Sequence, residues 1–243
     1  KRKIMTPRAE LMFESQINAA MKLAEILPAT VIKNENFLII AQSLESLPIA
    51  NHLALKLGLA YEFLFTEPVL APNNPECAIA CVSETQEIVM VDELVRSFGI
   101  SLDYVYGQAN RLYEEKILKN MYKFRKGELL GNLEKKNVIL VDEGCESGLT
   151  ALTCIKTLVS LNAKAIFYAT PVIGSDNADE IAMLVDGIYT VHKIRDFVNV
   201  DFYYKEKTLS SAEEIMQILN KCPLYLPFHE TNKNKEKINA VQN

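Results

Sequence analysis

Two adjacent acids follow an apolar run in the second half of the chain. The run Val138-Ile-Leu-Val141 reads as a buried strand, and Asp142 and Glu143 come directly after it. A short loop of small and polar residues continues from there to Thr150. Ligands of open α/β sheets bind beyond the carboxyl ends of the strands. These acids and this loop are therefore the residues whose types and spacing can do chemistry.

The loop over residues 144–150 suits a phosphate monoester. It contains Ser147, Gly148 and Thr150, and it leads into a helix predicted from Leu149 to Leu161. Backbone N–H groups and hydroxyls at the start of a helix bind anions. Adjacent carboxylates repel phosphate, but they suit a ribose diol or a magnesium ion beside it. The combination predicts a phosphorylated sugar as the ligand.

Strands and helices alternate around this loop. Apolar, β-branched runs predict strands, and apolar residues three and four positions apart predict helices. The second half of the chain is expected to contain strands over 137–142, 163–170 and 187–191, and helices over 149–161, 176–184 and 211–219. Strand and helix in alternation indicate a parallel sheet.

The first half supplies further elements and an inserted segment. We expect helices over 8–27, 48–57 and 92–126, strands over 37–41 and 61–65, a loop over 67–75 and a hairpin of residues 78–82 and 87–91. Gly58 is expected to end the second of these helices. The long helical segment is broken near Gly99, and Ser101 caps its second half.

Composition excludes several classes of function. The 243 residues include 26 Lys and Arg against 31 Asp and Glu, so the net charge is −5 and non-specific nucleic-acid binding is not expected. No apolar run reaches the ~20 residues that span a membrane. The five cysteines include no C-x-x-C pair, and the three histidines have no zinc-site spacing. We expect a reduced, cytoplasmic protein.

The stretch from Val138 to Thr150 resembles the phosphoribosyl-diphosphate (PRPP) binding motif of type I phosphoribosyltransferases: four apolar residues, two acids, a short loop and Ser/Thr-Gly-x-Thr. The resemblance covers about residues 8–205, and segments 71–80, 92–100 and 197–203 look like a bacterial branch of predicted phosphoribosyltransferases. It implies a central, mostly parallel sheet flanked by helices, with a hood of hairpin and helices over about residues 66–126. We expect one domain over residues 1–228 and a disordered tail over 229–243.

The resemblance also implies roles for the motif residues. Asp142 and Glu143 would bind the ribose hydroxyls and hold Mg²⁺ that arrives with the ligand. The 5′-phosphate would be bound by the loop residues Gly144, Cys145, Ser147, Gly148, Leu149 and Thr150.

Two loop residues have alternative interpretations. Glu146 matches an acid that faces the purine as a general acid/base in the hypoxanthine-guanine enzymes, or it is a solvated loop residue. It must point away from the phosphate, because a carboxylate about 5 Å from it costs roughly 3 kcal/mol per unit charge at an effective dielectric constant near 20. Cys145 is either a nucleophile near a helix N-terminus or, in the absence of a nearby histidine, a packed thiol.

The acceptor base is expected after the strand over 187–191. His192, Arg195 and Phe197 lie there, close to Tyr189. These residues are either base contacts or packing residues.

Three departures from the family concern cations. Its Pro-Arg-Gly-Gly pyrophosphate loop is replaced by Ala41-Gln-Ser-Leu-Glu-Ser-Leu-Pro48, its Arg-Lys pair by Glu67-Pro68, and its purine-binding lysine by Thr170-Pro171. Pyrophosphate needs cations, Mg²⁺ or backbone donors. The basic residues of 101–126 either replace these cations, in this subunit or in a homodimer partner, or form a solvated helix face.

Two functional hypotheses remain. In the first, the protein binds PRPP or a nucleoside 5′-monophosphate with Mg²⁺ and transfers phosphoribosyl to a nitrogenous base. In the second, it is a catalytically degenerate nucleotide-binding regulator or a protein-interaction scaffold. The loop over residues 42–47 favours the second hypothesis.

Overall fold

The computed structural model describes residues 12–207 and 211–228. The start of the predicted first helix and the predicted disordered tail lie outside these residues. In chain order the elements are α1 (Gln16–Ile26), α2 (Ala29–Asn34), β1 (Phe37–Ala41), α3 (Leu47–Leu57), β2 (Tyr61–Phe63), β3 (Thr66–Ala71), β4 (Asn74–Ser83), β5 (Ile88–Met90), α4 (Asp92–Ser97), α5 (Leu102–Leu112), a π-helical turn η1 (Tyr113–Ile117), α6 (Leu118–Arg125), β6 (Asn137–Val141), α7 (Leu149–Ser160), β7 (Ala165–Gly174), α8 (Ser175–Ala182), β8 (Gly187–Ile194), a 3₁₀ turn η2 (Val200–Tyr203) and α9 (Ala212–Lys221).

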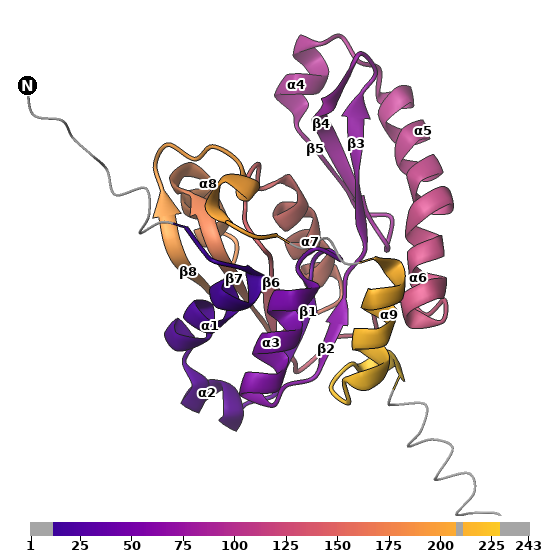
Figure 1. The fold of residues 1–243 in the computed structure, drawn as a ribbon. Helices are drawn as coiled ribbons and strands as arrows, with labels where there is room; N and C mark the ends of the chain where they lie inside the picture. Colours follow the sequence, from indigo (N-terminus) through magenta and orange to yellow (C-terminus); the bar gives the residue numbers. More distant parts are fainter. Residues whose placement is uncertain (1–11, 208–210, 229–243) are drawn as a thin grey trace, which may run out of the picture.

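A five-stranded parallel sheet forms the centre of the fold, in the order β2-β1-β6-β7-β8 (Figure 1). Strands β1 and β6 are in register from Phe37 opposite Asn137 to Ala41 opposite Val141. Their carboxyl ends therefore meet at one edge of the sheet. This arrangement confirms the predicted α/β fold with a central parallel sheet flanked by helices.

Alternate residues of these strands enter two separate cores. Ile39 and Ile139 pack with the apolar faces of α1 and α3. Ile40 and Leu140 point the other way and pack with α7 and α8. A strand directs successive side chains to opposite faces, so a continuously apolar strand needs helices on both sides. The sheet is covered on both faces, and its edge at the strand carboxyl ends remains for a ligand.

The hood consists of the antiparallel sheet β3-β4-β5 and the helices α4, α5 and α6. In Figure 1 it stands above the carboxyl edge of the parallel sheet. The loop predicted over residues 67–75 is wrong, because β3 and β4 pair across it from Thr66 opposite Ser83 to Ala71 opposite Asn74. Proline suits β3 because β3 is an edge strand that pairs on one side only.

A buried ion pair lies at the base of the hood, and a further hydrogen bond of its arginine reaches β2 of the parallel sheet. Glu84 follows β4 and Arg125 ends α6, and their side chains are 0% and 2% exposed. Arg125 also donates to the carbonyls of Phe63 (2.8 Å) and Glu128 (2.7 Å). These contacts tie the end of α6 to the segment that leaves the parallel sheet, so they set where the hood stands over the sheet edge.

Several predicted boundaries are confirmed and two are corrected. Ser101 caps α5 by accepting a hydrogen bond from the Tyr104 N–H, and Gly58 ends α3 with a left-handed φ of 70°. Strand β7 runs to Gly174 rather than to residue 170, and β8 runs to Ile194 rather than to residue 191. The two strands pair over these added residues, which extends both of them. In the part of the chain that the structure describes, no helix is long and apolar enough to cross a membrane.

Candidate functional site

A cavity of about 220 Å³ lies at the carboxyl ends of β1 and β6. One wall is the loop that follows β6, and the other is the start of the loop that follows β1. The lining residues are Gln42, Ser43, Glu45, Asp142, Glu143, Gly144, Cys145, Glu146, Ser147, Gly148, Thr150 and Ala151. The structure thus brings together most of the predicted phosphate and ribose residues. We call this space the phosphate-loop cavity.

Free backbone donors gather where α7 begins. The first hydrogen bond at the start of α7 joins the Leu152 N–H to the Gly148 carbonyl at 2.9 Å. The N–H groups of Leu149, Thr150 and Ala151 therefore precede the helical ladder, and a helix leaves such donors open at its start. Gly148 has a left-handed φ of 72°, which turns the loop into the helix. This is the arrangement expected of an anion site.

Gly144 allows the loop to pass close to a neighbouring segment. A Cβ atom at this position would lie 2.8 Å from Val200 Cγ1 and 3.2 Å from Val172 Cγ1. Gly144→Ala should therefore lower the free energy of unfolding by about 1–3 kcal/mol, as overpacking does. Urea denaturation would measure the loss. Gly107→Ala in α5 is the matched control, because a Cβ there meets nothing within 4 Å. A variant at 144 as stable as the control would contradict this packing.

Asp142 lies at the cavity but is held by the protein. Its residue is 5% exposed, Oδ2 accepts a hydrogen bond from the Tyr168 hydroxyl at 2.7 Å, and Oδ1 accepts one from the Glu143 N–H at 2.8 Å. Burial raises the pKa of Asp142 to about 7, and the negative charge of Glu143 adds to the rise. Hydrogen bonds from Tyr168 and from the backbone oppose it. This carboxyl group therefore changes between its neutral and charged forms near pH 7.

Glu143 is neutralised by a lysine that the sequence did not single out. Glu143 Oε1 lies 2.7 Å from Lys207 Nζ, which also contacts Asp201 Oδ1 at 2.8 Å. Burial lowers the pKa of Lys207, but the contacts with Asp201 and Glu143 outweigh it and leave the pKa raised. Glu143 Oε2 accepts a weaker hydrogen bond from Gln16 Nε2 at 3.4 Å. Lys207 is 64 positions away in sequence and has no motif around it, so only the fold reveals this pair.

These contacts engage the oxygens that would have to coordinate a magnesium ion held directly by the two acids. Each carboxylate oxygen of Asp142 and Glu143 already accepts a hydrogen bond or lies against Lys207. Mg²⁺ requires oxygen ligands that are free to point at it in octahedral geometry. The described residues also contain no group of three or more His, Cys, Asp or Glu side chains that could hold a metal ion. Magnesium binding at Asp142 and Glu143 stays a prediction.

The two loop residues with alternative interpretations differ in the structure. Glu146 is exposed at the cavity mouth, and its carbonyl accepts a hydrogen bond from Asn177 Nδ2 at 2.6 Å. Cys145 is 2% exposed, and burial together with the charge of Asp142 raises its pKa to about 12. A thiol with such a raised pKa is a poor nucleophile. The structure favours the packed interpretation for Cys145.

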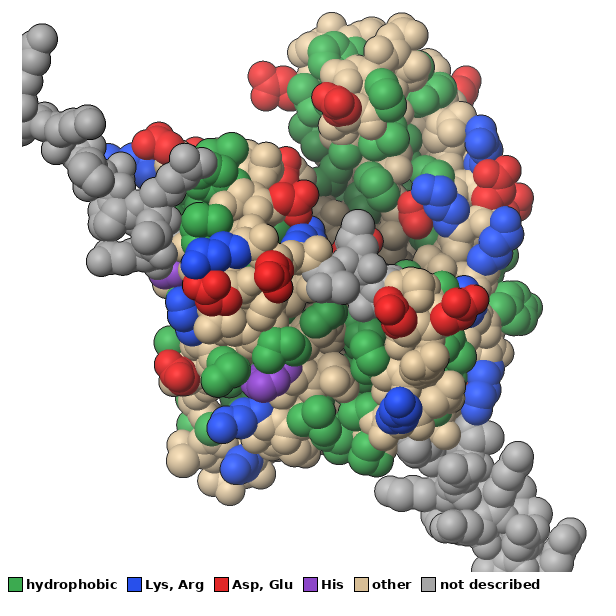
Figure 2. Space-filling view, viewed as in Figure 1, with side chains coloured by type: hydrophobic (Ala, Val, Ile, Leu, Met, Phe, Trp, Pro, Cys, Tyr) green, Lys and Arg blue, Asp and Glu red, His purple; other side chains and the backbone are tan. Residues whose placement is uncertain are grey.

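A second cavity of about 270 Å³ adjoins the first beneath the hood. The two share Gln42, Ser43, Glu45 and Thr150, and the second is completed by Leu44, Leu64, Phe65, Thr66, Glu67, Pro68 and Asn120. Figure 2 shows the surface hollowed between the hood and the body of the molecule. The residue Gln42 is 4% exposed, and its Oε1 has no hydrogen-bond partner in the part of the chain that the structure describes.

The predicted base-binding residues lie elsewhere. His192 is inside β8 and its ring packs 5.3 Å from that of Phe13, while burial and the nearby Lys22 lower its pKa. Phe197 packs 5.1 Å from the ring of Tyr203, and Arg195 is exposed. Among the described residues that line the two cavities, there is no His192, Arg195 or Phe197. Their role as base contacts stays a prediction.

Three basic residues of the hood form ion pairs with acids of the hood. Arg111 pairs with Glu115, and Lys116 pairs with Glu67 at 3.0 Å. Arg125 is buried with Glu84. Neither cavity wall, over the residues the structure describes, includes a Lys or Arg side chain. The solvated-face interpretation is favoured for this chain by itself, and the partner-subunit alternative stays a prediction.

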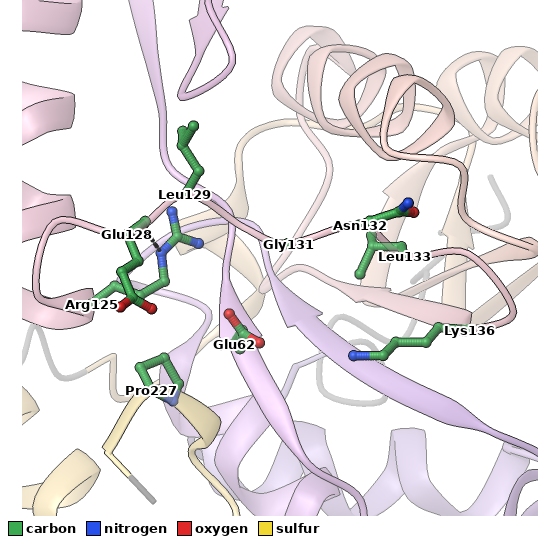
Figure 3. Close-up of a pocket in the computed structure, with 9 residues that line it drawn as sticks. All are labelled: Glu62, Arg125, Glu128, Leu129, Gly131, Asn132, Leu133, Lys136 and Pro227. Carbon is green, nitrogen blue, oxygen red and sulfur yellow. Dashed lines mark hydrogen bonds between the residues drawn. The ribbon is translucent and has the colours of Figure 1, made fainter. Parts of the chain in front are cut away.

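A third cavity, of about 170 Å³, lies away from the strand carboxyl ends. Its walls include Glu62, Arg125 and Lys136, and Figure 3 shows their side chains around it. Lys136 directly precedes β6, so this space opens at the amino end of that strand. The guanidinium of Arg125 is already shared between Glu84, Phe63 and Glu128. The main cationic group of this cavity is therefore less available to a ligand than the backbone N–H groups of the phosphate-loop cavity.

Comparison with known proteins supports the fold and a distant kinship. Two Mycobacterium tuberculosis proteins, each named "Putative phosphoribosyl transferase", are 22% identical to this chain over 212 residues, which is 87% of this chain and 47% of theirs. The chain thus spans about half the length of these relatives. The crystal structure of TT1426 from Thermus thermophilus matches 87% of this chain and 99% of its own, with a TM-score of 0.69 and 21% identity. No family model matches the chain.

Proposed function

We propose that this protein binds a phosphoribosyl ligand, ribose 5-phosphate or a nucleoside 5′-monophosphate, in the phosphate-loop cavity. The observation that carries the proposal is the cavity itself, which is lined by the whole loop from Asp142 to Gly148 and by the start of α7. The 5′-phosphate would accept hydrogen bonds from the open N–H groups of Leu149, Thr150 and Ala151. The names of the distant relatives support the same ligand class.

The charges around the cavity are compatible with a phosphate once their pairing is considered. Four carboxylates line it, those of Glu45, Asp142, Glu143 and Glu146. Lys207 balances Glu143, and the raised pKa of Asp142 leaves that group largely without charge below pH about 7. The sequence therefore overstates the negative charge that the phosphate meets. Glu146 and Glu45 are exposed, where water screens their charges.

Transfer of the phosphoribosyl group to a nitrogenous base is the second candidate function. The names of the relatives favour it, with Glu146 as the acid/base that its position in the motif implies. The cavity walls argue against it, because no Lys or Arg from the described residues stands in them to stabilise a departing pyrophosphate. We therefore place ligand binding first and catalysis second.

Isothermal titration calorimetry with matched ligands tests the proposal. AMP, GMP and ribose 5-phosphate should bind, and adenosine should bind at least tenfold more weakly, because it lacks the phosphate that charge-assisted hydrogen bonds would hold. Titrations with Mg²⁺ and with a chelator show whether the ion is required. Equal binding of AMP and adenosine, or no binding of any phosphate, would remove the proposal. Consumption of PRPP with any base in a panel would instead support the second candidate function, phosphoribosyl transfer.

Glu146→Gln separates the two candidate functions. Removal of this exposed carboxylate from the cavity mouth should tighten AMP binding about two- to fivefold, because one repulsion of the phosphate disappears. If Glu146 is instead the acid/base of a transferase, the variant should lose about 10²–10⁴-fold in turnover. Titration and a PRPP-consumption assay on the same preparation distinguish these results. Glu134→Gln, at a position outside both cavity walls, is the control.

A further inference from the structure

We propose that the group of the ligand that enters the second cavity is a hydrogen-bond donor, a hydroxyl or an amine, and not a diphosphate. The inference rests on the proposed function, in which the phosphate-loop cavity holds a 5′-phosphate. It narrows the ligand to a pentose 5-phosphate whose anomeric substituent donates hydrogen bonds. Three independent features of the residues around the second cavity carry it.

The first feature is the buried acceptor of Gln42. This residue lines both cavities, is 4% exposed, and has an Oε1 without a hydrogen-bond partner among the described residues. Buried polar atoms are nearly always hydrogen-bonded, and one left unpaired destabilises the folded state. A ligand that brings a hydroxyl or an amine to this oxygen would remove the penalty. An oxygen of a diphosphate cannot, because it is itself an acceptor.

The second feature is that the loop uses its own backbone donors. The Gln42 N–H donates to the Val141 carbonyl at 3.1 Å, and the Leu47 N–H donates to the Leu44 carbonyl at 3.2 Å. Ser43 and Ser46 exchange hydrogen bonds, each backbone N–H donating to the hydroxyl of the other at 3.2 and 3.1 Å. A loop that binds pyrophosphate must present such N–H groups to the ligand. Here four of them donate within the loop or to the neighbouring strand β6.

The third feature is charge. Glu45 and Glu67 both line the second cavity, and no Lys or Arg of the described chain does. Lys116 contacts Glu67 at 3.0 Å, which balances that acid, but Glu45 has no such cation beside it in the described structure. A diphosphate would bring several negative charges to this wall without a cation to meet them. A neutral hydroxyl meets no repulsion, and an amine is attracted.

Calorimetry on the full chain with a set of three ligands tests the inference. Ribose 5-phosphate carries the anomeric hydroxyl, 1,4-anhydroribitol 5-phosphate lacks only that group, and PRPP carries a diphosphate there. We expect ribose 5-phosphate to bind about tenfold more tightly than the anhydro analogue. We expect PRPP, with or without Mg²⁺, to bind more weakly than ribose 5-phosphate. Preference for PRPP in either condition would overturn the inference.

Substitutions of Gln42 show whether this side chain causes the expected preference for ribose 5-phosphate over the anhydro analogue and PRPP. Gln42→Met has a similar length and no polar atom, so it should bind ribose 5-phosphate and the anhydro analogue equally. Gln42→Arg should shift the preference toward PRPP. Gln217→Met changes an exposed glutamine on α9 and should leave the wild-type preference intact. An undiminished preference in Gln42→Met would exclude Gln42 as its source.

Failure of the inference and failure of the proposed function give different results. If none of the three ligands binds, the phosphate site itself is absent and the proposed function falls. If all bind but PRPP is preferred, the function stands and the inference falls. Thermal unfolding guards against misfolded variants, because Gln42→Met removes an unpaired buried oxygen and should unfold at no lower temperature than the wild type. A large drop in its midpoint would contradict the assignment of that oxygen as unpaired.

Discussion

Glu84→Gln should lower the free energy of unfolding by about 3–5 kcal/mol, because it leaves the charge of Arg125 buried without a counter-charge. Glu84 accepts three donors, from Arg125 Nη2, the Leu130 N–H at 2.8 Å and the Phe65 N–H at 3.0 Å. A glutamine has one oxygen and an amide group in place of two acceptor oxygens, so at least one of these donors also loses its partner. Chemical denaturation followed by circular dichroism measures the change.

A neighbouring pair provides the control for this substitution. Glu87 pairs with Lys156 at 2.7 Å, and both side chains are accessible, at 31% and 55%. Glu87→Gln should therefore change stability by less than about 1 kcal/mol, since exposed ion pairs contribute little. The double variant Glu84→Gln, Arg125→Met should recover part of the loss, because it removes the buried charge as well as its partner. Equal losses of stability in Glu84→Gln and Glu87→Gln would contradict the stabilising role of the buried Glu84–Arg125 ion pair.

Asp142→Asn should remove a pH dependence of about 4 kcal/mol from the stability of the fold. Burial raises the pKa of Asp142 from 3.8 to about 7, a difference of about 3 units at ~1.4 kcal/mol each. Between these values the folded protein binds more protons at this site than the unfolded chain does. The stabilisation is therefore complete below pH 3.8 and is lost as the pH rises through about 7.

Asparagine is a close match for the protonated acid at this position. Its Oδ1 can still accept the Glu143 N–H, and its amide can donate to the Tyr168 oxygen. We expect the variant to be more stable than the wild type above pH about 7 and similar to it in mild acid. Urea denaturation across this range measures both slopes, and Asp179→Asn, an exposed carboxylate at 73%, should keep the wild-type slope. A wild-type slope in Asp142→Asn would contradict the raised pKa.

The parallel sheet could be predicted from the sequence because its strands have a recognisable local pattern of apolar residues. Residues 37–41 and 138–141 are continuously apolar, which is typical of a strand covered on both faces. The loop with its two acids stands at the strand end for the same reason, so the position of the site followed from the strand. The hairpin β3–β4 was missed because Pro68, Pro72 and the two asparagines that follow it resemble a loop, while edge-strand pairing depends on a partner strand.

The chemistry of the site was less predictable than its position. Ribose binding by Asp142 and Glu143 stays a prediction, and the structure adds contacts with Tyr168 and Lys207, which lie 26 and 64 residues further along the chain. Such partners have no local pattern, since they are brought together by the tertiary fold alone. The acidic replacement at Glu45 could be read from the sequence. That the N–H groups of this loop donate within the loop, and that the Gln42 Oε1 is unpaired among the described residues, could not be read from the sequence.

The central claim is that a 5′-phosphate binds at the start of α7, and an NMR titration of the ¹⁵N-labelled protein with AMP tests it most directly. Each backbone N–H reports on its own surroundings, so the site is identified without a substitution. We expect the largest shifts at Leu149, Thr150 and Ala151, and little change there with adenosine. Shifts centred on the cavity around Arg125 and Lys136, or no shifts with AMP, would contradict it.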